Sequence, residues 1–350
     1  MNTELVDRIA RAVLYEGYLL YPYRPSAVKN QQRFNFGVVY PRAYSETQSG
    51  TDKCTIQTEC LVEGDASTQC TVRVRFLRML ARSIIKANPS TEPSGHSFES
   101  VARLEVSGKA YHPWQEACEE TIEVSEFSLA ALAAQSMQWP FRLSARQDRE
   151  PIQDQRGVIV GMVLRDKRTI TGRIDLFAQR LQDGLVKLTT HISNDSRMDT
   201  PECASREQAL ELALVSTHTI LEVRSGAFVS LVDPPDQYAP SARACQNLGT
   251  WPILVGAEGQ RDTMLSSPII LYDYPQVAPE SPGDLFDGAE IDEILSLRIL
   301  TMTEQEKREM RESDDRARQI LERTETLPDE QWMKLHGALR GLRQITGETE

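Results

Sequence analysis

The sequence predicts an α+β protein, mainly antiparallel sheet with a C-terminal helical hairpin. Three observations support this class. Short runs rich in Val, Ile, Thr and aromatic residues alternate with polar residues, which is typical of half-buried strands. Turns of Gly, Asp and Ser join these runs in place of helical crossovers, which favours antiparallel pairing. Two helix-start signals and an apolar stripe of helical spacing then follow near the C-terminus.

The composition is that of a soluble globular protein, with 40% apolar and 26% charged residues over 350 positions. No segment reaches the roughly 18 apolar residues of a transmembrane helix. Charged residues within positions 1–20 interrupt any apolar signal-peptide region, so we expect a cytoplasmic protein. The net charge of −12 argues against nucleic acid or a membrane as the main partner.

We expect three units along the chain. Residues 1–200 form a β-rich domain with an N-terminal helix. Residues 201–300 form an α+β domain with a proline-rich acidic loop, and residues 301–350 form a helical hairpin tail. Residues 280–350 carry ten Lys and Arg against eighteen Asp and Glu, so a basic surface on a protein partner would suit this end of the chain.

The N-terminal helix of the first unit ends near Gly17 and has one apolar side, formed by Leu5, Ile9, Ala12 and Val13.

Strand patterns follow, in the runs FNFGVVY, CTIQTECLVE and QCTVRVRFLRML. The last run alternates apolar with basic residues, namely Val72, Val74 and Phe76 against Arg73, Arg75 and Arg78. Gly64 and Asp65 are turn residues between the second and third runs, so these two runs are expected to form an antiparallel pair.

The second unit begins with a helix that has Ser205 as its N-cap. Ser225 and Gly226 then separate two apolar runs, which predicts a hairpin. The runs WPILVG and SPIILYDY predict buried strands beneath the proline-rich acidic loop.

Two capping boxes open the last helices, because Asp287 precedes Glu290 by three residues and Thr303 precedes Glu306 by the same spacing. The helix after Thr303 has a narrow apolar seam. The final helix has a cleaner stripe, formed by Trp332, Leu335, Leu339 and Leu342. We therefore expect a helical hairpin whose apolar face, with Trp332, contacts a partner.

No metal or cofactor is predicted. Six cysteines are expected to stay reduced in a chain without an export signal. The spacing of Cys54, Cys60 and Cys70 matches no zinc or iron–sulfur pattern, and partly buried thiols on neighbouring strands are the simpler interpretation. The carboxylates of Asp273, Glu280, Asp284 and Asp287 are hard ligands of the kind that Mg²⁺ prefers, but a solvated, partner-facing loop explains them better.

His218 is the best-placed histidine for catalysis, because polar residues surround it within an apolar region. Catalysis would need a nucleophile and an orienting acid within reach, and Cys245, Ser266 and Asp233 are the candidates. No G-x-S-x-G motif supports this, so a structural histidine is expected. A hydrolase or transferase of unrecognised type centred on His218 is the alternative.

Candidate partner-binding residues lie in two further segments. Tyr18, Tyr21, Tyr23 and Arg24 combine aromatic and basic side chains, as protein hot spots do; RNA-stacking platforms share this composition, but the net charge disfavours them. The second segment, the proline-rich acidic loop of residues 272–287, contributes Tyr272, Tyr274 and Asp284.

Four motifs carry a family resemblance. They are LYEGYLLYPYRPSAVKNQQRFNFGVVYPRAYSE at residues 14–46, STHTIL within residues 214–235, NLGTWPILVGAEG at residues 247–259, and the strand, loop and helix starts of residues 262–306. With these motifs the chain resembles a family of accessory proteins encoded beside high-affinity, actinobacterial-type NiFe hydrogenases. The resemblance implies a role near hydrogenase assembly or function and brings no catalytic residues with it.

Nickel storage would need clustered His and Cys ligands, which five scattered histidines do not supply. The pattern of the hydrogenase-processing peptidases is also absent. We therefore expect a non-catalytic accessory or assembly protein whose partner is another protein: a hydrogenase subunit, a maturation factor or a second copy of the chain.

Overall fold

The computed structural model of the protein describes residues 3–14, 36–48, 51–88, 97–275, 302–313 and 324–326, with Ile299, Arg318, Leu321 and Glu322. It shows a predominantly β fold, with 53% strand against 17% helix. The predicted α+β class is wrong, because most of the described helices are single turns of five or six residues that connect strands. The predicted C-terminal helical hairpin is not shown. The structure gives the bounds of its first helix, α7 (Glu304–Ser313), whereas Trp332 and the second helix lie outside the described residues.

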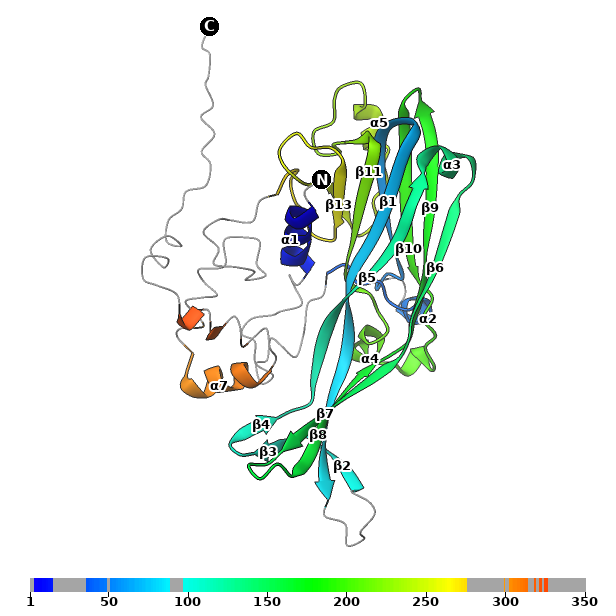
Figure 1. The fold of residues 1–350 in the computed structure, drawn as a ribbon. Helices are drawn as coiled ribbons and strands as arrows, with labels where there is room; N and C mark the ends of the chain where they lie inside the picture. The colour runs from blue at the N-terminus through cyan, green and yellow to red at the C-terminus, as the bar shows by residue number, and fades with distance from the viewer. Residues whose placement is uncertain are drawn as a thin grey trace.

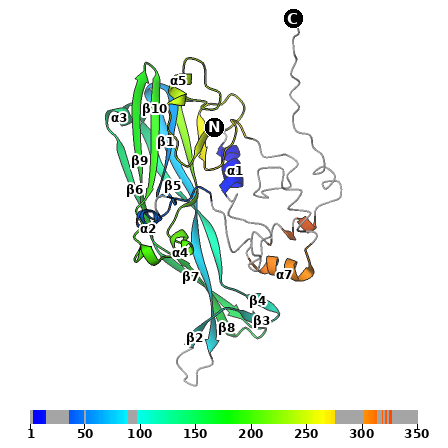
Figure 2. The same cartoon turned by 180° about the vertical axis from the view of Figure 1, so that it is seen from behind.

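One antiparallel sheet of eleven strands organises the molecule, with the main order β12-β13-β11-β1-β10-β9-β6 (Figures 1 and 2). The sheet strands are β1 (Thr55–Asn88), β2 (Ser97–Val101), β5 (Trp114–Ser128), β6 (Met137–Leu143), β7 (Arg146–Gln153), β8 (Ile159–Lys167), β9 (Ile170–Gln182), β10 (Leu185–Asn194), β11 (Val215–Val229), β12 (Trp251–Leu254) and β13 (Thr263–Ser267). A separate two-stranded hairpin consists of β3 (Leu104–Val106) and β4 (Lys109–Tyr111). The helices besides α7 are α1 (Thr3–Leu14), α2 (Arg42–Thr47), α3 (Leu129–Ala134), α4 (Arg206–Leu210), α5 (Ala239–Arg243) and the 3-10 turn η2 (Pro201–Cys203).

Strand β1 turns a corner between Gly64 and Gln69, where its register with β11 shifts. Its first arm, residues 55–63, pairs with β10, and its second arm pairs with β5 and β11 (Figure 1). β11 turns at the same place, where Ser225 has a φ of 54°. The Thr68 hydroxyl ties the two turns together, since it accepts from the Asp65 N–H at 2.9 Å and donates to the Ser225 carbonyl at 2.7 Å.

Two sequence predictions are wrong at this corner. The runs on either side of Gly64 do not pair with each other, and neither do the arms on either side of Ser225, because every arm pairs with another strand. The turn residues mark a bend of two paired strands and not hairpins. The bend places the two arms of β1 on opposite sides of the main core, which takes Ile56, Cys60 and Val62 from the first arm and Val72, Val74 and Phe76 from the second.

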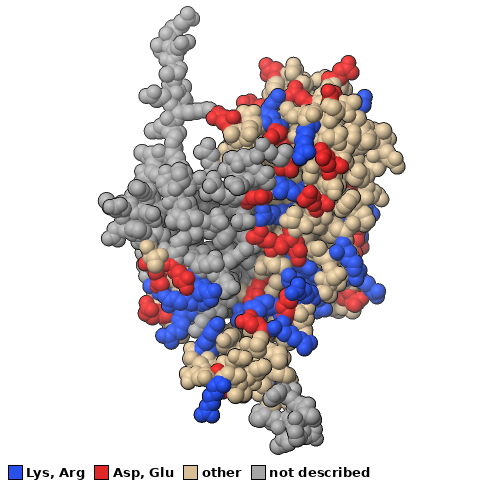
Figure 3. Space-filling model, in the orientation of Figure 1, with Lys and Arg blue, Asp and Glu red and all other residues tan. Residues whose placement is uncertain are grey.

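The predicted alternation of the second arm is confirmed for its apolar residues, since Val72, Val74 and Phe76 are all fully buried. The arginines of this arm are not free solvent-facing charges. Ion pairs of 2.6–3.2 Å link four of them to carboxylates of neighbouring strands, namely Arg73 to Glu222, Arg75 to Glu119, Arg78 to Glu120 and Arg82 to Glu116. Figure 3 shows acidic and basic groups interspersed over this face.

The far end of β1 extends below the main body, where it pairs with β2 and β8 (Figure 1). A small second core, formed by Ile84, Leu104, Ile152 and Val163, stabilises this extension.

The predicted N-terminal helix is confirmed as α1, which covers one side of β11, β12 and β13. Val6, Ile9 and Val13 are buried there against Ile220 and Leu265. Ser205 is confirmed as an N-cap, because its hydroxyl accepts from the Gln208 N–H at 3.2 Å, although the helix α4 has only five residues. Within the described parts of the chain, no helix has the length and apolar character that crossing a bilayer requires.

Candidate functional site

Residues 268–275 form an ordered loop directly after β13, and we call this segment the pinned loop. The sequence predicted a strand here, but β13 ends at Ser267. Pro268 explains the difference, because proline has no N–H to donate to the next rung of the sheet.

Two consecutive residues anchor the pinned loop. The Asp273 carboxylate accepts from the Leu254 N–H at 2.8 Å through Oδ1 and from the Ser230 hydroxyl at 2.5 Å through Oδ2. The Tyr274 N–H donates to the Leu254 carbonyl at 2.8 Å, and the Tyr274 hydroxyl donates to the Gln260 carbonyl at 3.0 Å. The backbone of the loop is therefore fixed to the end of β12.

Side chains of the pinned loop alternate between the body and solvent. Ile269 and Leu271 pack against the cluster beneath α1. Ile270 is 69% exposed and Tyr272 is 82% exposed. A fixed loop that presents two large side chains to solvent has the character of a contact site, because exposed aromatic side chains are enriched in binding hot spots.

The predicted partner-binding residues are thus resolved in part. Tyr272 is presented to solvent, whereas Tyr274 anchors the loop through its hydroxyl. The remaining predicted residues, Tyr18, Tyr21, Tyr23, Arg24, Asp284 and Trp332, lie outside the described residues. Two of the sequence motifs, residues 14–46 and residues 262–306, are in contact, because a Cβ placed on Gly37 would lie 2.4 Å from the Pro268 Cβ.

His218 lies on β11 and is fully buried. Its Nδ1 lies 2.7 Å from the Ser216 carbonyl, so Nδ1 carries the proton and donates. Its Nε2 then accepts from the Ser267 hydroxyl at 3.2 Å. Ser267 also accepts from the Ile269 N–H at 3.1 Å, so this cluster connects β11 to the start of the pinned loop.

The serine at His218 is Ser267 and not Ser266, which instead bonds to Thr58 and Thr250 within the core. The alternation of side chains along the two strands could have predicted Ser267 as the neighbour of His218. His218 and Ile220 point to the same side of β11, and Ile220 pairs with Leu265, so Ser267 shares that side. Neither Cys245 nor Asp233 forms a hydrogen bond with this cluster in the described structure.

The environment of His218 suits a structural role. Burial lowers the pKa of His218 to about 4, the Ser216 carbonyl opposes this shift, and Arg75 lowers the pKa further. General bases work best with a pKa near the operating pH. Since His218 and Ser267 are both fully buried, a substrate has no access to them in this conformation.

The cysteines that the sequence groups together lie around the main core. Cys60 and Cys70 are buried, and Cys54 is half-buried. Burial raises the pKa of Cys60 well above its ordinary value and raises the pKa of Cys70 to about 12, so these two thiols stay protonated. Among the described residues, no three His, Cys, Asp or Glu side chains are grouped as metal ligands.

Comparisons with protein-family models, with curated proteins and with solved structures found no match for this chain.

Proposed function

We propose that the chain is a cytoplasmic, non-catalytic accessory or assembly protein that binds protein partners in NiFe hydrogenase maturation or function. The observation that carries the proposal is the pinned loop, with Ile270 and Tyr272 held in solvent. The four sequence motifs supply the hydrogenase context, and the partner is a hydrogenase subunit or a maturation factor.

The energetics of the loop favour binding. Burying a large apolar side chain contributes roughly 1.5–3 kcal/mol, so Ile270 and Tyr272 together offer a substantial part of a specific contact. Asp273 and Tyr274 already fix the backbone beside them. Binding of a partner would therefore cost little conformational entropy for ordering this loop.

The experiment is capture of partners from the native host with three forms of the full-length protein. The first form is the wild type, and the second carries Ile270→Ala and Tyr272→Ala. The matched control carries Val158→Ala and Ile159→Ala, which removes two side chains that are 54% and 38% exposed at the turn into β8. We expect hydrogenase subunits or maturation factors to co-purify with the wild type and the control and to be lost from the loop variant.

All three forms should unfold at the same temperature, because the altered side chains are exposed in the folded state. Retention of the partner by the loop variant would place the interface elsewhere. A wild-type protein purified as a clean monomer with a retained small molecule would favour the hydrolase or transferase alternative instead.

A further inference from the structure

A hollow of about 550 Å³ lies on the outer face of β1, β10 and β9, and none of its lining residues belongs to the pinned loop. Its size is that of a small-molecule site. Two rows of cross-strand neighbours form its floor: Gln57, His191 and Asp175 in the first row, and Glu59, Thr189 and Phe177 in the second.

The first fixed element of this hollow is Glu59, which is only 7% exposed. Its Oε1 lies 3.1 Å from the Lys187 ammonium and accepts from the Thr189 hydroxyl at 3.2 Å. Its Oε2 accepts from the Gln246 N–H at 2.8 Å. The buried carboxylate therefore holds two donors of the floor in place and neutralises the lysine.

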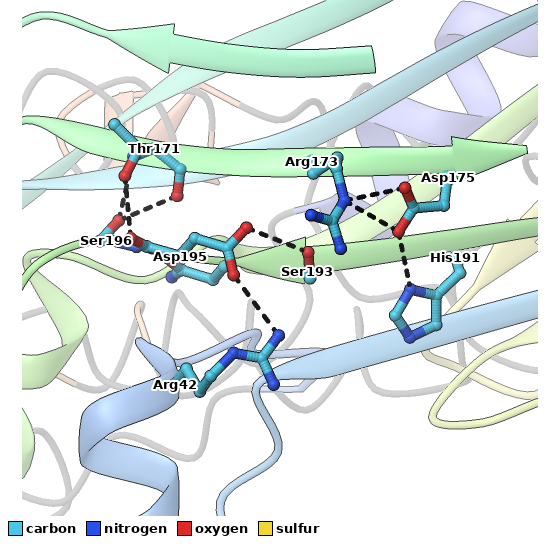
Figure 4. A network of polar contacts seen from close by, with 9 residues as sticks. Arg42, Thr171, Arg173, Asp175, His191, Ser193, Asp195 and Ser196 are labelled. Carbon is cyan, nitrogen blue, oxygen red and sulfur yellow. Dashed lines mark hydrogen bonds and ion pairs between the residues drawn. The ribbon is translucent and has the colours of Figure 1, made fainter. Parts of the chain in front are cut away.

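The second fixed element is Asp175, which is 5% exposed. Figure 4 shows Arg173 and His191 converging on its carboxylate from β9 and β10. The Arg173 Nε donates to Oδ2 at 3.0 Å and lies 2.8 Å from Oδ1. The His191 Nδ1 lies 3.7 Å from Oδ2, which leaves Nε2 as the ring nitrogen on the side away from the acid.

Phe177 follows Asp175 on the same face of β9 and lies opposite Thr189 of β10. It is 44% exposed, although it belongs to the central part of a strand. Next to it on the same face of β9 is the exposed amide of Gln179. The hollow thus combines an aromatic surface with amide, hydroxyl and imidazole groups, and its buried carboxylates are matched by Lys187 and Arg173.

We propose that this hollow binds a neutral polyhydroxylated ligand, a saccharide. A sugar ring has an apolar face that can lie against Phe177 and hydroxyl groups that both donate and accept, as the surrounding side chains require. The paired charges favour neither an anion nor a cation. The hollow lies on the face of the sheet, where strand edges are not available to pair with an extended peptide.

The test is isothermal titration of the full-length protein with maltohexaose, cellohexaose and mannohexaose up to about 10 mM, a range that detects weak complexes. We expect at least one to bind. Phe177→Ala and His191→Ala should each weaken that binding about tenfold or more, because they remove the stacking surface and a fixed polar group. Tyr272→Ala, which lies in the pinned loop, should leave saccharide binding unchanged.

The matched variants separate this site from the proposed function, since Phe177→Ala should retain the captured protein partner. Three outcomes would overturn the saccharide site. They are absence of binding by all three hexasaccharides, binding that Phe177→Ala and His191→Ala both leave intact, and preference for a heparin-derived sulfated hexasaccharide at this hollow.

Discussion

His218 gives a sharp test of whether the cluster beneath the pinned loop is structural. In the unfolded chain this histidine has its ordinary pKa of 6.5, and burial in the folded chain lowers the pKa to about 4. The unfolded state therefore binds the proton more tightly than the folded state. The stabilising contribution is fully present above pH 6.5 and is lost as the pH falls from 6.5 towards 4.

The magnitude follows from the size of the shift. Each pKa unit corresponds to about 1.4 kcal/mol, so the full loss of unfolding free energy between the two pKa values is about 3 kcal/mol. Between pH 7 and pH 5 the expected loss is about 2 kcal/mol, since the folded histidine remains almost entirely neutral at pH 5.

The assay is urea unfolding, followed by tryptophan fluorescence, of the wild type and of His218→Asn at pH 7 and at pH 5. The asparagine keeps a donor near the Ser216 carbonyl but cannot titrate. We expect the variant to be less stable than the wild type at pH 7. Between pH 7 and pH 5 its free energy of unfolding should fall by about 2 kcal/mol less than that of the wild type. Ile270→Ala, which changes an exposed side chain that does not titrate, should keep the wild-type dependence. Equal pH dependence in the wild type and in His218→Asn would refute the assignment of a buried, neutral imidazole.

Three further substitutions and one control substitution test the frame around the sites, each by urea unfolding. Gly37→Ala should lower the free energy of unfolding by roughly 2 kcal/mol or more, because φ is +52° and the new Cβ would meet Pro268. The control Gly157→Ala, at a φ of +79° with open space around it, should lower it by about 1 kcal/mol. Thr68→Val should cost about 1–3 kcal/mol, since it removes both hydrogen bonds at the corner and keeps the shape; no loss would mean that the bend does not depend on this hydroxyl. Ile9→Ala should cost about 2–4 kcal/mol if α1 is docked as described, and a cost below 0.5 kcal/mol would mean that it is not.

Local signals in the sequence predicted local structure well. The alternation around Val74, the N-cap at Ser205 and the capping box at Thr303 and Glu306 are all confirmed. Each of these features depends on neighbours within a few residues, so the chain itself contains the needed information.

The long-range arrangement was not predictable in the same way. Gly64 and Ser225 both read as hairpin turns, and a hairpin is what such residues form when the flanking strands have no better partner. Here β5, β10 and β11 supply those partners from distant parts of the sequence. Which strands compete for an edge is a property of the whole sheet, and a turn motif carries no information about it.

The same reasoning explains why no sequence pattern indicated the hollow on β1, β10 and β9. Its residues occupy the outward positions of three strands that look like ordinary solvent-facing polar positions when each strand is read alone. The unusual feature appears only across the strands, where Glu59 and Asp175 are almost completely buried at outward positions of the sheet. Each is compensated by a basic side chain, at 3.1 Å for Lys187 and 2.8 Å for Arg173. Burying charge is costly even when it is paired. The segment from Tyr238 to Gln246 covers one part of this face, where it packs on Leu61 and Leu185 and donates the Gln246 N–H to Glu59. The proposed saccharide would cover the part that contains Asp175 and Phe177.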